Sequence, residues 1–277
     1  MKRQNLHCHT NFDDGADSPE MMVRAAEKAG LASIGISLHC PIPGEEAWCC
    51  AVSNEEAFIA EMRRLRELYA GRLEVWCGLE YDLDADRRTV PPYDYIIGSC
   101  HMLSEMPFDY DPDTAAHLIA YHGGAACSAQ KYYEKLSVLA EYPEISVVGH
   151  FDLPTKYNER VPLYDTASKA YRDAAFAAME KLNAAGKIFE INSGAMSRGW
   201  RTSPYPSEEL LLHLKSIGGR ICISSDAHCA AHIDYAFDQC EALARSCGFT
   251  EVWQFDGRDF QPTPNMESCK IHFQNEG

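Results

Sequence analysis

The sequence lacks three features that would point to particular classes of protein. No stretch approaches the roughly 20 consecutive apolar residues that a membrane-spanning helix needs. The opening residues, MKRQNLHCHT, contain no apolar segment of the kind found in secretory signals, so we expect a cytoplasmic protein without a membrane partner. No repeat or Gly/Ser linker interrupts the 277 residues. Because α/β barrels reach this length as one unit, we expect a single domain over residues 1–277.

Basic residues are scarce relative to acidic ones. The chain has 25 Lys and Arg against 41 Asp and Glu, which gives a formal net charge of −16 at pH 7. Such an excess of negative charge repels polyanions, so we expect no nucleic-acid partner. An anionic small substrate would instead need compensating cations at its site, either metal ions or a few well-placed arginines.

Cysteine is abundant, but its spacing excludes two common kinds of site. The 12 cysteines include no Cys-x-x-Cys pair, which argues against a zinc ribbon and a thioredoxin-like motif. We expect most of them to be reduced thiols that pack as small apolar side chains.

Short β-rich runs alternate with helical patterns along the chain. Capping residues and glycine stops predict helices over about residues 18–28, 54–69, 165–185, 207–217 and 234–246. Strands are expected at residues 5–9, 33–38, 73–80, 93–100, 145–150, 188–192 and 220–225, with a weaker one at 251–255. Strands separated by helices form βαβ units, and seven or eight such units indicate an α/β barrel. The active site of such a barrel lies at the carboxyl ends of its strands.

Metal-ligating side chains cluster at these expected strand ends. His7 and His9 flank Cys8, and the alternation of side chains along a strand places both imidazoles on one face. The turn after the first strand carries Asp14, and further strands end at His39, Glu80, His101, His150, Asp226 and His228. A single histidine of this kind is usually an ordinary core or surface residue, but the joint pattern predicts a metal site.

Nine candidate ligands are more than one tetrahedral ion can use. Zinc, iron and manganese accept imidazole and carboxylate together, so a cluster of two or three divalent ions is the simplest interpretation. Multi-metal sites suit phosphoester hydrolysis, because the ions generate hydroxide at neutral pH and neutralise the phosphoryl oxygens.

The motifs resemble the PHP (polymerase and histidinol phosphatase) family. In the family's order they are His7-x-His9-Thr10, Asp14-Gly15, Leu38-His39, Gly78-Leu79-Glu80, Ser99-Cys100-His101, Gly149-His150-Phe151-Asp152 and Ser225-Asp226-Ala227-His228. Leu38 departs from the Asp that commonly precedes the second-motif histidine. The resemblance implies a distorted (β/α)7 TIM-like barrel with three divalent metal ions, which would be zinc, manganese or iron.

The resemblance also implies the ligand sets. These are His7, His9, Glu80 and Asp226 for one ion; Glu80, His101 and His150 for a second; and Asp14, His39 and His228 for the third, with the adjacent Asp13 as an alternative to Asp14. Glu80 would bridge two ions, and Asp226 or His228 would manage the proton at the leaving oxygen. We expect Asp152 to orient one of the ligands from behind.

Residues 190–194, 197–201 and 204–207 look most like those of stand-alone histidinol-phosphate phosphatases. The resemblance therefore implies hydrolysis of L-histidinol phosphate in histidine biosynthesis, by attack of a metal-bridging hydroxide. Arg160, Arg198 and Arg201 follow strands on the expected active face, and guanidinium groups bind phosphate oxygens well, so we expect them to bind substrate. The alternatives are another phosphomonoester, a nucleotide or a nucleic-acid 3′ end as substrate, or a non-catalytic metal-binding module.

Overall fold

A computed structural model of the chain describes residues 3–85 and 92–264. Its main sheet has seven strands in the order β1 (Gln4–Asn5), β2 (Ser33–His39), β3 (Glu74–Asp82), β4 (Tyr95–Ser99), β7 (Val147–Val148), β8 (Ile188–Asn192) and β9 (Arg220–Ser224). All neighbouring strands in this sheet pair in parallel. The spatial order follows the chain order, which is the topology of a barrel and not of a doubly wound open sheet.

The sheet curls until its first and last strands meet. Cys8 forms a parallel bridge with Ala227, and the backbone N–H of His9 donates to the Ala227 carbonyl at 2.8 Å. Asn5 reinforces this seam, because its side-chain amide donates to Ser225 Oγ at 2.7 Å. The expected TIM-like barrel is confirmed. It is distorted because β1 and β7 have only two residues each, and because a single bridge joins its two edges.

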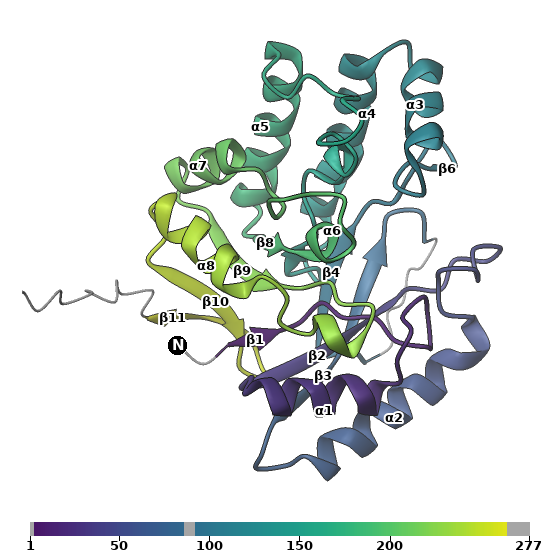
Figure 1. The fold of residues 1–277 in the computed structure, drawn as a ribbon, viewed down its shortest axis with the longest axis vertical. Helices are drawn as coiled ribbons and strands as arrows, with labels where there is room; N and C mark the ends of the chain where they lie inside the picture. Colours follow the sequence, from purple (N-terminus) through teal and green to yellow (C-terminus); the bar gives the residue numbers. More distant parts are fainter. Residues whose placement is uncertain (1–2, 86–91, 265–277) are drawn as a thin grey trace, which may run out of the picture.

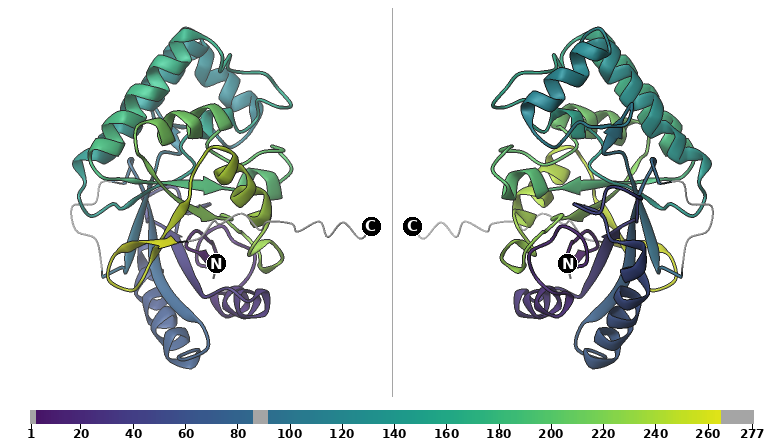
Figure 2. Two further views of the ribbon diagram at one scale, coloured as in Figure 1. Left: turned by 90° about the vertical axis from the view of Figure 1, so that its left-hand side faces the viewer. Right: turned by 90° about the vertical axis from the view of Figure 1, so that its right-hand side faces the viewer.

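Helices cover the outer surface of the barrel (Figures 1 and 2). The five helices that the sequence predicts are present within a few residues of the expected bounds: α1 (Pro19–Ala29), α2 (Glu55–Leu68), α5 (Lys169–Ala184), α7 (Glu208–Ser216) and α8 (Phe237–Ser246). Helix α1 shows why the signals work, since Ser18 accepts a hydrogen bond from the Met21 N–H and Gly30 ends the helix at a left-handed φ of 74°. In the described part of the chain, no helix combines the length and apolar character needed to cross a membrane.

The connection between β4 and β7 is more elaborate than the sequence predicts. It contains a small hairpin of β5 (Met102–Leu103) and β6 (Met106–Pro107), followed by α3 (Pro112–Tyr121) and α4 (Ala125–Leu136). Asp111 caps α3 and Pro112 occupies its first turn, yet Gly123 and Gly124 interrupt the helical pattern soon afterwards. The pattern of apolar residues in each of these two helices is therefore too short to show a clear helical periodicity. Helix α4 packs along α5, where Tyr133 and Tyr171 share a hydrogen bond of 2.7 Å between their hydroxyls.

A second hairpin, β10 (Glu251–Phe255) with β11 (Phe260–Pro264), covers the amino-terminal end of the barrel. The Gln4 side chain bonds to it twice, donating to the Phe255 carbonyl and accepting from its N–H, each at 2.9 Å. Phe255 and Phe260 pack against apolar side chains from the barrel interior: Leu6, Tyr95, Ile97, Val147, Ile188 and Cys222. The hairpin therefore closes the end of the barrel that faces away from the candidate ligands.

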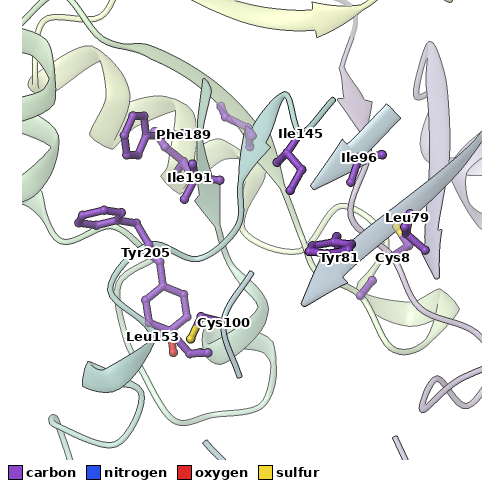
Figure 3. Packing of buried hydrophobic residues seen from close by; sticks show 14 of the residues in the cluster. Cys8, Leu79, Tyr81, Ile96, Cys100, Ile145, Leu153, Phe189, Ile191 and Tyr205 are labelled. Carbon is purple, nitrogen blue, oxygen red and sulfur yellow. The ribbon is translucent and has the colours of Figure 1, made fainter. Parts of the chain in front are cut away.

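A larger apolar cluster lies between the sheet and the helices. Figure 3 shows part of it, with Cys8, Leu79 and Ile191 among the labelled side chains. Cys8 is fully buried in this cluster, as the alternation along the first strand predicts. Its neighbours His7 and His9 face the barrel interior and contact Glu80 there. The segment after β1 thus supplies the core with one side chain and the candidate site with the two beside it, although the strand expected over residues 5–9 is limited to Gln4–Asn5 and an isolated bridge at Cys8.

Candidate metal centre and its cavity

All nine predicted ligands converge at the carboxyl ends of the barrel strands. Their ligand atoms form four overlapping groups, each with members within 4.8 Å of one another: His9, Asp14, His39 and His228; His7, Glu80 and His150; His7, His9 and Asp226; and His39, Glu80 and His101. These residues come from six of the barrel strands and the segments that follow them, which is the arrangement expected for a barrel active site.

Glu80, on β3, lies at the middle of this arrangement. Its side chain is 1% exposed, and Ser99 Oγ donates a hydrogen bond of 2.6 Å to Oε1. The two carboxylate oxygens lie 3.0 to 3.5 Å from ring nitrogens of five histidines: His7, His9, His39, His101 and His150. A carboxylate with imidazoles around both oxygens has the geometry to serve two cations at once.

Three of the histidines are held from behind by carboxylates. The nitrogen–oxygen distances are 2.7 Å for His7 Nδ1–Glu190, 3.0 Å for His9 Nδ1–Asp13 and 2.9 Å for His101 Nδ1–Asp82. A hydrogen bond at Nδ1 fixes the ring and leaves Nε2 available, as is usual for histidines that bind metals. The sequence placed these acids near strand ends without giving them this role.

Asp152 does not take the orienting role expected of it. Its Oδ2 accepts from the backbone N–H of Ser207 at 3.1 Å and lies 3.6 Å from Arg201 Nη1. Among the described residues, this carboxylate makes no hydrogen bond to a histidine. The three acids named above occupy that position instead.

The residues fit a group of divalent cations. His7 Nε2, His9 Nε2 and Glu80 Oε2 are buried without a hydrogen-bond partner among the described residues. Glu80 Oε2 lies 3.1 Å from the first nitrogen and 3.3 Å from the second. Buried polar atoms seldom remain unpaired, and imidazole with carboxylate is the donor set that zinc, iron and manganese accept.

The close packing of these groups shifts their pKa values. Burial by itself would raise the pKa of Glu80, but His7 and His39 hold it well below its usual value. Burial disfavours the charged form of His101, yet Glu80 and Asp82 raise its pKa to about 9. Burial and the neighbouring His9 lower the pKa of His39 to about 4. Because metal ligands must be deprotonated, cation binding to this centre is coupled to the release of protons.

Arg198 joins the centre at Asp226. Its guanidinium donates to Asp226 Oδ2 at 3.0 Å, and its Nη1 lies 2.9 Å from His228 Nδ1. Burial would raise the pKa of Asp226, but Arg198 and the histidines hold it well below its usual value. Gly194 allows this close approach, because a Cβ there would lie 2.5 Å from Asp226 Oδ2. Asp226 itself has a left-handed φ of 47°, which is uncommon for a residue with a side chain.

A cavity of about 300 Å³ opens beside the centre. Seven of the candidate ligands line it, and the rest of its wall includes Trp48, Asp109, Tyr110, Leu153, Lys156 and Arg198. The volume is that of a site for a small organic molecule. Sequence reasoning missed Trp48, Asp109 and Tyr110, which lie in loops without a recognisable motif and reach the cavity only through the fold.

The three predicted phosphate-binding arginines have different surroundings. Arg198 lines the cavity, but Arg160 and Arg201 do not. Arg201 is buried; it donates to the Pro204 carbonyl at 3.3 Å and its guanidinium lies over the Tyr205 ring. Arg160 is exposed and donates to the Gly199 carbonyl. The geometry therefore supports Arg198 as an anion-binding group and gives Arg201 the contacts of a structural residue.

Comparison with known proteins finds relatives that are named as histidinol-phosphatases. The chain is 27% identical to a protein of Deinococcus radiodurans named probable histidinol-phosphatase, over 92% of this chain and 97% of that one. It is 26% identical to the histidinol-phosphatase of Bacillus subtilis, over 89% of this chain and all of that one.

A solved structure shares the fold. It is histidinol phosphate phosphatase from Lactococcus lactis, whose crystal structure contains zinc, L-histidinol and phosphate. The TM-score is 0.77 at 22% identity, and the alignment covers 94% of this chain and 99% of that one. Residues 5–194, more than half of the chain, match the PHP domain. The chain belongs to the PHP domain family.

Proposed function

We propose that this chain hydrolyses L-histidinol phosphate to L-histidinol and phosphate, and that it does so as a metal-dependent phosphomonoesterase. The observation that carries the proposal is the convergence of nine ligand-type side chains beside a small cavity that Arg198 also lines. The names of the two curated relatives support the choice of substrate, as do the ligands of the Lactococcus lactis protein.

Three divalent ions are the cofactors of this proposal, and the buried unpaired atoms at Glu80, His7 and His9 support it. The four overlapping groups contain all nine residues of the ligand sets that the family resemblance implies, but they divide them differently. His39 groups with Glu80 and His101 as well as with Asp14, and His150 groups with His7 and Glu80. When bound, the ions would supply positive charge to the phosphoryl oxygens and make water more acidic.

The chain's own residues bind and orient the ester. Arg198 presents a planar group of donors at the cavity wall, which suits two phosphate oxygens and stabilises the negative charge that they carry during the reaction. Glu190, Asp13 and Asp82 hold three histidine rings in fixed orientations, so the centre is organised before substrate arrives.

The proton for the leaving oxygen of the alcohol is assigned to the pair formed by Asp226 and His228. His228 Nδ1 lies 3.5 Å from Asp226 Oδ1, and both residues line the cavity. His228 is the more accessible of the two, because its side chain is 26% exposed against 5% for Asp226.

Phosphate release from L-histidinol phosphate tests the proposal. The assay uses protein supplied with manganese or zinc, and it includes common phosphomonoesters, nucleotides and a short oligonucleotide for comparison. A strong preference for L-histidinol phosphate is the expected result. Equal activity on the other esters would retain a phosphoesterase but reject this substrate, and no activity in a metal-loaded sample would favour a binding module.

A further inference from the structure

One residue of the cavity wall has a charge that phosphate binding does not explain. Asp109 follows β6 and lines the cavity together with the candidate ligands and Arg198. It does not belong to any group of described residues that is close enough to share an ion. A carboxylate in this place repels the phosphate of the substrate, so it weakens the electrostatic attraction that Arg198 and bound metal ions would exert on that phosphate.

The backbone of Asp109 is held firmly. Its carbonyl accepts hydrogen bonds from Lys156 Nζ, at 2.6 Å, and from the Tyr157 hydroxyl. Two residues further on, Asp111 caps helix α3 by accepting from the Thr114 N–H at 2.7 Å. The carboxylate is therefore presented from a fixed loop, which is what a recognition group requires.

The carboxylate of Asp109 has spare hydrogen-bonding capacity. Oδ2 lies 3.1 Å from Lys156 Nζ, whereas Oδ1 accepts no hydrogen bond from the described residues. The side chain is 21% exposed. Burial raises the pKa of this acid, but Lys156 and His101 outweigh that effect and hold the pKa below its usual value. Asp109 therefore lines the cavity with one carboxylate oxygen that has no hydrogen-bond partner among the described residues.

We propose that Asp109 determines specificity by binding the protonated amine of an amino-alcohol phosphate ester. The inference rests on the proposed function, because L-histidinol phosphate carries a primary ammonium group on the carbon next to the ester CH₂. Phosphate at the cation centre then leaves this ammonium within the same small cavity as Asp109. The carboxylate attracts amino-alcohol esters and repels phosphate esters that have no cationic group.

The test compares two substrates that differ only in the amine. They are L-histidinol phosphate and 3-(imidazol-4-yl)propyl phosphate, which lacks the amino group. We expect Asp109→Asn to lower kcat/KM for L-histidinol phosphate about 10- to 100-fold, mainly through KM, because a charged hydrogen bond is lost. We expect kcat/KM for the analogue to stay unchanged or to rise. Asp113→Asn is the matched control, because it removes an exposed charge from the same region.

Equal losses on both substrates would overturn the proposal and show a structural role, and so would no loss on either. Wild-type protein gives a readout that does not depend on folding of the variant. L-histidinol should inhibit it at a concentration at least ten times lower than 3-(imidazol-4-yl)propan-1-ol does, and equal inhibition would also overturn the proposal.

A second pair of substrates separates this proposal from the proposed function. O-phosphoethanolamine and ethyl phosphate also differ in an amine. If the enzyme ignores L-histidinol phosphate but prefers O-phosphoethanolamine, and loses that preference in Asp109→Asn, the proposed function fails while the role of Asp109 stands. If it shows no preference within either pair, the role of Asp109 fails.

Discussion

At the scale of single residues, side chains of the same chemical type have different contacts, and we therefore expect them to have different roles. Arg198 and Arg201 are three positions apart, yet one lines the cavity and the other packs on Tyr205 inside the protein. Glu80 and Glu74 are likewise on one strand, but only Glu80 points among the histidines, whereas Glu74 is exposed at the other end. These pairs allow matched substitutions.

Replacing Glu80 removes the charge at the middle of the centre. We expect Glu80→Gln to lower kcat at least about 100-fold and to reduce the bound metal, because the two carboxylate oxygens face five imidazoles. Phosphate release and elemental analysis of the purified protein measure the two effects. Glu74→Gln is the control on the same strand, and normal metal content with full activity in Glu80→Gln would refute the assignment.

We expect substitution of Arg198 to affect mainly activity and substitution of Arg201 to affect mainly stability. Arg198→Ala is expected to lower kcat/KM about 100-fold with a small change in stability, because this guanidinium lines the cavity. Arg201→Met is expected to lower the free energy of unfolding by about 3 kcal/mol, because it leaves Asp152 buried without its cationic partner. Steady-state kinetics and urea unfolding separate the two. The interpretation is wrong if Arg201→Met changes KM alone.

At the scale of elements, the sequence predicts best what depends on local signals. The five expected helices lie within a few residues of the expected places, although within the described residues only α1 and α5 among them have a side-chain hydrogen bond at the N-cap, from Ser18 and Ser168. The strands that carry continuous apolar runs are also in the expected places. The β5–β6 hairpin and α3 are short and follow one another closely, so neither gives a sustained period.

The candidate site also contains residues that local sequence signals predict and residues that they do not. Its ligands could be predicted because each lies at the end of an expected strand or in the turn that follows. Asp109 and Trp48 could not, because they reach the cavity from loops whose positions depend on distant contacts.

The β10–β11 hairpin contributes to stability at the end of the barrel opposite the centre. Phe255 is buried among Leu6, Tyr95 and Phe260. We expect Phe255→Ala to lower the free energy of unfolding by about 3 to 5 kcal/mol, because it leaves a cavity in this cluster. Urea unfolding measures the loss, with Gln261→Ala on the exposed face of the hairpin as control. A large fall in kcat of the folded variant at low temperature would contradict this separation of roles.

At the scale of the whole molecule, the barrel collects many charged groups into one buried place. The centre is built from imidazoles and carboxylates that repel or attract one another at distances near 3 Å. His101 Nε2 and His150 Nε2, for example, are 3.2 Å apart. Cations relieve such crowding, so the folded state and metal binding should stabilise each other.

Removal of metal should therefore destabilise the protein. A chelator is expected to lower Tm, and excess manganese or zinc at about 1,000 times the dissociation constant should restore about 4 kcal/mol of stability. Binding should also release protons at neutral pH, because His101 of the metal-free protein has a pKa raised to about 9. Calorimetry in buffers of different ionisation enthalpy measures this release. An unchanged Tm after verified metal removal would count against a structural contribution of the ions.

The closure of the barrel through Cys8 and Ala227 has a consequence for synthesis of the chain. His7 and His9 are made before the other candidate ligands, whereas Asp226 and His228 leave the ribosome only after all of them. A nascent chain that has not passed β9 lacks the last strand of the barrel and part of two ligand groups. A complete candidate metal centre therefore forms only after the last strand of the barrel has been made.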